Sequence, residues 1–104
     1  MVKVFISQPM AGRTQREIEE ERDEAFAEVA AMYVENGESC EEIPSYFGPR
    51  AEREGTPLEW LGRSIQLLSH ADVAVFCKGW TEARGCRIEH MCAVSYGIEV
   101  IEAL

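Results

Sequence analysis

Short apolar runs alternate along the chain with longer amphipathic segments, a pattern typical of alternating strands and helices. Residues 2–6 form a β-branched and aromatic run, and residues 7–12 read as a loop. Thr14 and Glu17 then have the spacing of a capping box, and Asn36-Gly37 supplies a helix stop. Between them, apolar residues recur at helical spacing: Ile18, Ala25, Phe26, Val29, Ala30 and Tyr33. We expect the opposite, acidic face of this helix to be solvated.

The rest of the chain continues the same alternation. Residues 39–43 are a weak strand candidate, and a loop over residues 45–55 follows. Thr56 and Glu59 form a second capping box, with Pro57 at the favoured first helical position. The buried stripe of that helix is expected to be Leu58, Leu61, Ile65 and Leu68. Three elements follow: a strand over residues 72–77, a helix over 82–96 that Gly97 ends, and a strand over 98–101.

This order predicts a single α/β domain over residues 1–104, with an open parallel sheet and helices on both faces. Four strands in the order 2-1-3-4 place the reversal of strand order between the first and third strands. Ligands bind at such a point, beyond the carboxyl ends of the strands. The loops over residues 7–13 and 78–85 would face each other there, and this crevice is the candidate site.

Charge and cysteine usage limit the partners. Nineteen acidic residues against ten basic ones give a net charge of −9, and such a surface repels the phosphate backbone of a nucleic acid polymer. No apolar run approaches the ~20 residues of a membrane span, and the first residues do not fit a signal peptide. We therefore expect a cytoplasmic protein with reduced cysteines. Cys86 and His90 lack the paired spacing of a structural zinc site, so we expect neither a metal nor a cofactor.

The two loops contain residues that suit a small polar ligand. Gly12 and Arg13 precede a helix N-terminus, where free N–H groups favour anions. Arg13 can add a bidentate contact to a phosphate or carboxylate, or it can simply lie exposed on the first turn. Gly79 and Trp80 place a large ring at the mouth of the crevice. This ring either stacks on a base or packs into the core or an interface.

Glu89 is the candidate for chemistry. It lies in the first or second turn of a helix whose N-terminus points into the crevice. The helix dipole there would keep a carboxylate ionised and available as a nucleophile or base. The alternative is an ordinary surface glutamate. Gly85, one turn earlier, is expected to mark a close approach of the backbone to another group.

Three segments resemble the nucleoside 2-deoxyribosyltransferase-like superfamily, and most closely its short DUF4406 branch: residues 6–10, residues 71–72, and Gly79-Trp80 with residues 84–90. The resemblance spans essentially the whole chain. It implies a flavodoxin-like fold, dimers or larger assemblies, and cleavage or exchange of the N-glycosidic bond of deoxynucleosides or their 5′-monophosphates. It places the nucleophile at Glu89. It also places a sugar- or phosphate-binding loop at Ser7, Gln8, Pro9, Met10, Gly12 and Arg13.

Two positions depart from the pattern of the catalytic members. Ser64 stands where many of them carry an aspartate that binds the sugar and transfers protons, a role that serine cannot fill as an acid or base. Ala83 stands where nucleotide-specific members hold the phosphate with a serine, and Arg84 beside it can compensate. We expect these residues to complete the substrate-binding set: Ser64, Gly79, Trp80, Arg84 and Gly85.

Three functions stay open at this point. The first is an N-glycosidase or 2-deoxyribosyltransferase-like enzyme that acts on a nucleoside or nucleotide through Glu89. The second is a nucleotide-binding module on the same fold, which sequesters or senses its ligand without turnover. The third is an assembly protein that uses the Trp80 loop and residues 45–55. We expect a homodimer or a higher homo-oligomer in every case.

Overall fold

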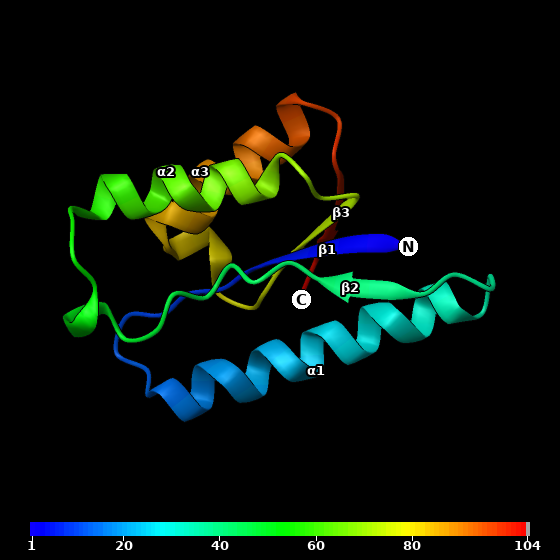
Figure 1. Ribbon diagram of the computed structural model, residues 1–104, viewed down its shortest axis with the longest axis horizontal. Helices are drawn as coiled ribbons and strands as arrows, with labels where there is room; N and C mark the ends of the chain where they lie inside the picture. The colour runs from blue at the N-terminus through cyan, green and yellow to red at the C-terminus, as the bar shows by residue number, and fades with distance from the viewer. Residues whose placement is uncertain (104) are drawn as a thin grey trace.

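The computed structural model describes residues 1–103, and of residue 50 it describes the backbone alone. The elements in chain order are β1 (Val2–Ser7), α1 (Gln15–Val34), β2 (Cys40–Glu42), α2 (Pro57–Leu68), β3 (Val73–Phe76), α3 (Arg84–Ser95) and β4 (Glu99–Glu102) (Figure 1). Two 3₁₀ turns, η1 (Arg50–Glu52) and η2 (Trp80–Glu82), precede α2 and α3. The four strands form one parallel sheet in the order β2-β1-β3-β4. This is the predicted α/β architecture and strand order.

Strand order reverses at β1, which lies between β2 and β3. Val2 is in register with Cys40 on one side, and Ser7 is in register with Phe76 on the other. The carboxyl ends of β1 and β3 are therefore neighbours. A crevice at this edge is where an open α/β sheet binds its ligands.

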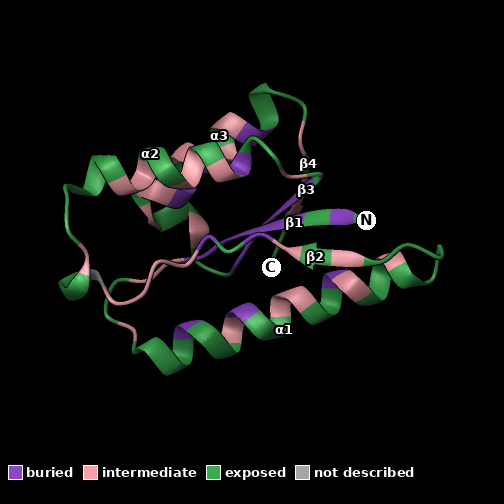
Figure 2. Cartoon of the chain, in the orientation of Figure 1, coloured by how far each residue is buried: buried purple, intermediate pink, exposed green. Residues whose placement is uncertain are grey.

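Helices cover both faces of the sheet because side chains alternate along each strand. Val4 and Ile6 of β1 pack on the side of α1, whereas Phe5 packs on the side of α2 and α3. Figure 1 shows α1 on one side of the sheet and α2 with α3 on the other. In Figure 2 the buried residues concentrate in β1 and β3, and most exposed residues lie on the outer helix faces. The two central strands are therefore the core that fixes the carboxyl edge.

Both capping boxes form as predicted. The Thr14 hydroxyl accepts from the Glu17 N–H, and the Glu17 carboxylate accepts from the Thr14 N–H at 2.8 Å. Thr56 and Glu59 repeat the arrangement at the start of α2. The backbone hydrogen bonds from the two threonines lower the pKa of each capping glutamate. Local sequence signals thus set where these two helices begin.

Some expected details differ in the structure. Leu58 is 75% exposed, because it lies in the first turn of α2 ahead of the packed part of the helix, whereas Leu68 is buried. The helix expected from residue 82 begins at Arg84, since residues 80–82 form a 3₁₀ turn behind Gly79. The last strand begins at Glu99, one residue later than expected.

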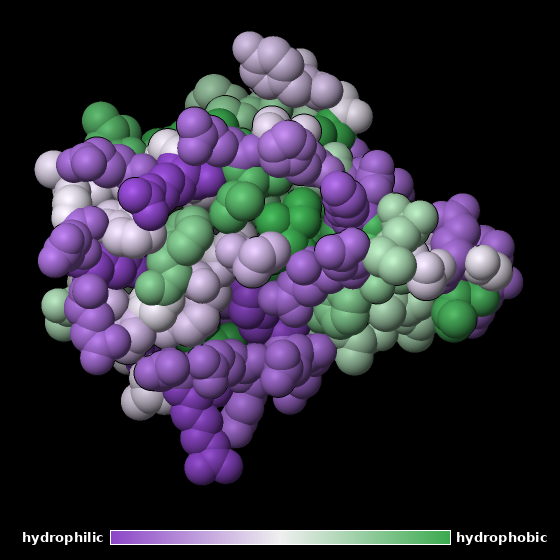
Figure 3. Space-filling model, in the orientation of Figure 1, coloured by the Kyte–Doolittle hydropathy of each residue, from purple (hydrophilic) through white to green (hydrophobic). Residues whose placement is uncertain are grey.

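The surface is hydrophilic along much of the outside. Figure 3 shows hydrophilic side chains (purple) along the amino-terminal part of α1 and more hydrophobic ones (green) toward its other end, where Met32 and Val34 are exposed. Within residues 1–103, no helix combines the length and apolar character needed to cross a membrane.

Candidate functional site

Glu89 is buried at the carboxyl edge of the sheet, with 7% of its surface exposed. It lies in the second turn of α3, whose first turn carries no side-chain cap. Ser7, at the end of β1, donates a hydrogen bond from its hydroxyl to Glu89 Oε1 at 2.7 Å. Ser64, from α2, donates a short hydrogen bond to Glu89 Oε2. Three separate elements therefore converge on one carboxyl group, and both of its oxygens are held.

Burial raises the pKa of Glu89 above its ordinary value of 4.5. Three groups act in the opposite direction: the hydrogen bond from Ser64, then that from Ser7, then the positive charge of Arg22. The expectation that the helix dipole keeps Glu89 readily ionised is therefore corrected. Removal from water outweighs the groups that favour the anion, so Glu89 ionises at a higher pH than an exposed glutamate does.

The two buried cysteines near this site stay uncharged at neutral pH. Burial raises the pKa of Cys86 to about 11 and that of Cys77 to about 12. Thiolates are the nucleophilic form of cysteine, and these pKa values leave almost none at neutral pH. All four cysteines are free thiols, and the two buried ones are poor nucleophiles at neutral pH.

Gln8, the residue after Ser7, lies on the opposite face of the sheet and joins a second polar network. Its side-chain amide donates to the backbone carbonyl of Ile18 at 3.0 Å and to Glu21 at 2.9 Å. Its amide oxygen accepts from Arg22 Nη1 at 2.7 Å. Gln8 thereby fastens the start of the predicted binding loop to α1.

Arg22, with Glu42 and Ser45, forms the part of this buried polar network that sequence reasoning missed. Arg22 is 4% exposed and donates to Glu42 at 2.8 Å and, through a short hydrogen bond, to the Ser45 hydroxyl. The signal that could have found it is its position, four residues after Ile18 and seven before Val29, inside the apolar stripe of α1. A charged residue in that stripe has to be paired.

The rest of the predicted binding loop is held by internal contacts. Arg13 Nη1 donates to the Pro9 carbonyl at 2.8 Å and lies 2.7 Å from the Glu21 carboxylate. Arg13 is therefore neither a free anion ligand nor simply exposed, because its charge is already paired within the chain. Met10 accepts a weak hydrogen bond from Arg53 at 3.6 Å, and Gly12 turns the loop with a φ of +75°.

The β3–α3 loop faces the β1–α1 loop, as the topology predicts. Gly79 has a φ of +86°, and a Cβ there would lie 3.5 Å from the Pro9 ring. Trp80 stacks on the His90 ring at 4.0 Å and packs against Phe76. One face of the indole is therefore already covered, and Trp80 packs against the core cluster of α2 and α3.

Arg84 and Gly85, at the start of α3, lie apart from the bonds that hold Glu89. Arg84 is exposed. A Cβ on Gly85 would meet Leu61 at 3.9 Å, an ordinary van der Waals contact. Within the described residues, Gly85 therefore marks no close approach of the backbone to another part of the chain.

A hollow of about 430 Å³ opens beside the binding loop. It is lined by the predicted loop residues Met10, Gly12 and Arg13 and, from the segment between β2 and α2, by Tyr46 and Arg53. The Tyr46 hydroxyl is buried and, among the described residues, finds no hydrogen-bond partner. Glu89 itself does not line this hollow, because the two serines and the surrounding helices cover it.

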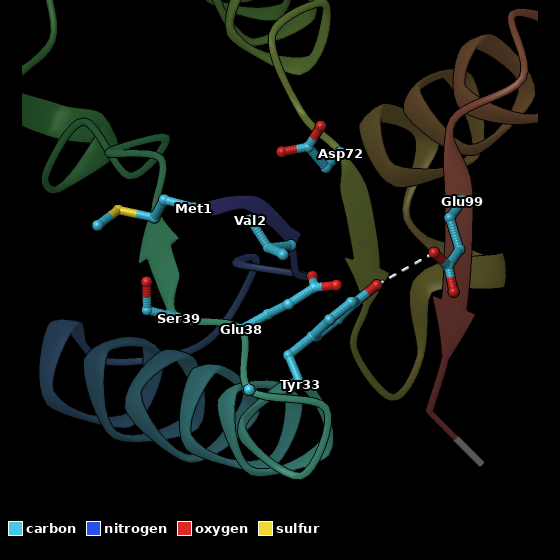
Figure 4. A pocket seen from close by; sticks show the side chains of 8 residues that line it. Met1, Val2, Tyr33, Glu38, Ser39, Asp72 and Glu99 are labelled. Atoms are coloured by element: carbon cyan, nitrogen blue, oxygen red, sulfur yellow. Dashed lines mark hydrogen bonds between the residues drawn. The ribbon is translucent and has the colours of Figure 1, made fainter.

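A second hollow, of about 510 Å³, lies at the opposite, amino end of the sheet (Figure 4). Figure 4 shows Asp72 and Glu99 at the starts of two neighbouring strands, with the Tyr33 hydroxyl bonded to Glu99. That hydrogen bond is 3.1 Å long. Asp72 accepts from the Lys3 N–H at 2.8 Å and lies just before β3, so it is at the other end of the sheet from Glu89. Across the described part of the chain, no group of three or more His, Cys, Asp or Glu side chains is placed to hold a metal ion.

Comparison with known proteins bears on the family. Neither the curated proteins nor the solved structures contain a match to this chain. The family model described as "Domain of unknown function (DUF4406)" matches residues 2–102, nearly the whole sequence. The chain therefore belongs to the DUF4406 family.

Proposed function

We propose that the protein cleaves or exchanges the base–sugar bond of a nucleoside or nucleotide, with Glu89 as the nucleophile. The observation that carries this proposal is a single buried carboxylate, held at both oxygens by Ser7 and Ser64, at the edge where an open α/β sheet binds ligands. The resemblance of the chain to the nucleoside 2-deoxyribosyltransferase-like superfamily gives the reaction class. Glu89 is the residue that the resemblance assigns to attack.

The reaction proceeds by two displacements at the anomeric carbon. Glu89 forms a bond to that carbon as the C–N bond breaks, and the electron pair leaves with the base, which takes a proton from solvent. Water, or the nitrogen of a second base, then attacks the same carbon and releases the carboxylate. Water yields the free sugar, and a second base yields a new nucleoside. One difficult displacement thereby becomes two easier ones.

The geometry favours Oε2 of Glu89 as the attacking atom. The Ser7 bond to Oε1 is buried, whereas the Ser64 bond to Oε2 is only partly buried. A sugar that enters from the side of Ser64 can therefore reach Oε2 while Ser7 keeps the carboxyl group oriented. The hollow of about 430 Å³ beside the binding loop is within the usual size range of small-molecule sites. Glu89 and Ser64 do not line that hollow, so a ligand bound there would have to extend beyond it to bring its sugar to Oε2.

The test is a panel of ribo- and deoxynucleosides and their 5′-monophosphates, incubated with pure protein and read by chromatography for free base. Glu89→Gln removes the nucleophile and keeps the size of the side chain, and we expect a loss of at least about 10³-fold. Glu99→Gln is the matched control, since Glu99 is an exposed glutamate at the other end of the sheet. We expect it to keep wild-type turnover.

The pH dependence sharpens this test. Because burial raises the pKa of Glu89, base release should increase with pH through that raised value and should fall on the acid side of it. Acid-quenched wild-type protein should also gain the mass of the sugar residue, whereas Glu89→Gln should not. Equal base release by wild type and Glu89→Gln would rule out this mechanism.

A second candidate is a binding module that has lost turnover. It is favoured by the engagement of both Glu89 oxygens and by Ser64, which stands where catalytic relatives carry an aspartate. It predicts that members of the same panel raise the melting temperature and are recovered unaltered. A panel in which no compound releases base or shifts the melting temperature would contradict both candidates.

A further inference from the structure

Arg22 is a buried charge whose partners all converge near the start of the binding loop. Its side chain is 5% exposed and contacts Glu42, Gln8 and the Ser45 hydroxyl. Ser45 in turn donates to the Ile6 carbonyl at 3.2 Å. A buried guanidinium is costly unless it is paired and hydrogen-bonded, and here it is both. Arg22 therefore ties α1, β1 and the segment after β2 together at one point.

This point lies directly behind Glu89. Ser7 and Gln8 are consecutive, so their side chains leave opposite faces of the sheet. Ser7 reaches Glu89 on the side of α3, and Gln8 accepts from Arg22 on the side of α1. Any displacement of Gln8 moves the backbone that carries the Ser7 hydroxyl. The two polar networks are thus joined through one peptide unit at the end of β1.

We propose that Arg22 is a positioning residue for Glu89: it fixes Gln8, and so the Ser7 hydroxyl, and it supplies the positive charge that faces the carboxylate across the end of the sheet. The proposal rests on Glu89 being the working carboxylate of the proposed function. In this proposal Arg22 acts only through Gln8, Ser7 and its charge.

The other charged or titratable groups named here are either paired with each other or uncharged. Arg22 is therefore the positive charge that acts on the Glu89 carboxylate. On α1, Arg13 and Glu21 are paired with each other at 2.7 Å. On α3 and after β3, Cys86 and Cys77 are uncharged thiols, with pKa values of about 11 and 12. From α2, Ser64 contributes only a hydroxyl. Glu42, on β2, is the group that partly offsets the charge of Arg22, at 2.8 Å.

The experiment measures the titration of Glu89 directly, without any substrate. Protein labelled with ¹³C at the glutamate side-chain carboxyls is titrated by NMR, and the Glu89 signal is identified by its absence in Glu89→Gln. Arg22→Met removes the charge at similar length, and we expect the pKa of Glu89 to rise by on the order of one unit. Arg22→Lys keeps the positive charge but loses the planar guanidinium group and its several hydrogen bonds, so the pKa of Glu89 should change less.

A second variant keeps Arg22 and removes the negative charge that partly offsets it. Glu42→Gln leaves the charge of Arg22 less compensated, and we expect the pKa of Glu89 to fall. If Arg22→Met does not fold, as judged by its amide spectrum, Arg22→Lys and Glu42→Gln decide the matter. An unchanged Glu89 pKa in the folded variants would overturn the proposal. Because no substrate is used, failure here is distinct from failure to release base.

Discussion

At the amino end of the sheet, Asp72 and Glu99 line an open hollow of about 510 Å³, whereas at the carboxyl end Glu89 is almost entirely buried. Both carboxylates at the amino end are exposed. Asp72 accepts a hydrogen bond from the Lys3 N–H, and Glu99 accepts one from the Tyr33 hydroxyl. Glu89 instead has a hydroxyl on each oxygen and a buried arginine behind it. The same kind of side chain is solvated at one end and desolvated at the other.

This contrast shows that the size of a hollow does not locate the chemistry. The larger hollow gathers exposed carboxylates that water already solvates. At the other end, folding has removed a carboxylate from water and raised its pKa, which costs stability. Such strained arrangements of titratable groups are typical of functional sites. We therefore place the candidate function at Glu89.

The largest effect should come from removing both serine hydroxyls at once. Ser7→Ala with Ser64→Ala leaves the Glu89 carboxylate buried without either hydrogen bond, and we expect a loss of about 3 kcal/mol or more in the free energy of unfolding at pH 7. Asp72→Asn is the matched change at the exposed end, with an expected effect within about 0.5 kcal/mol. Urea unfolding of both variants measures the difference. Similar losses in the free energy of unfolding for the two variants would contradict the difference between the two ends of the sheet.

Glu89→Gln should stabilise the protein as the pH rises. Because the folded-state pKa of Glu89 is raised, its contribution to stability is full below the unfolded value of 4.5 and is lost as the pH rises through the folded value. Glutamine does not titrate, so the free energy of unfolding of the variant rises relative to wild type across that pH range. The gain should be about 1.4 kcal/mol for each unit by which folding raises the pKa of Glu89. Urea unfolding from pH 4 to pH 8 measures this gain.

Glu99→Gln provides the control for that series. Glu99 is an exposed glutamate, so the same substitution there should show much less change across the window. A Glu89→Gln variant whose advantage over wild type is the same at pH 4 and pH 8 would contradict the raised pKa. A site that is more stable without its carboxylate would also show that Glu89 is kept for a reason other than folding.

The fold could be predicted from the sequence because its signals are local. Thr14 with Glu17, and Thr56 with Glu59, set two helix starts within four residues each, and the apolar run over residues 73–76 reads directly as a buried strand. The exposure of Leu58 could not be predicted in this way. Which end of an amphipathic helix extends past its packing partner depends on the tertiary arrangement.

The candidate site was predictable only in part. Topology and resemblance brought together Ser7, Ser64 and Glu89, and the structure joins these three by hydrogen bonds. Arg22 was missed because its partners come from three other segments, and no local spacing connects them. Trp80 was expected either to stack on a base or to pack into the core or an interface, and in the structure it packs, with the His90 ring on one of its faces. That contact depends on how α3 packs, which periodicity does not specify.

The smallest effect should come from the hydrogen bond at the exposed end. Tyr33→Phe removes the bond to Glu99, and solvent screening limits the expected loss to about 0.5 kcal/mol at pH 7. Burial, and then the bond to Glu99, raise the pKa of Tyr33 above 10, so this contribution is present below pH 10 and is lost as the pH rises through the raised value. Urea unfolding at pH 7 and at alkaline pH should show the wild-type advantage disappear. A loss above 2 kcal/mol at pH 7, or any change in base release, would show that the amino end is as tightly organised as the Glu89 site.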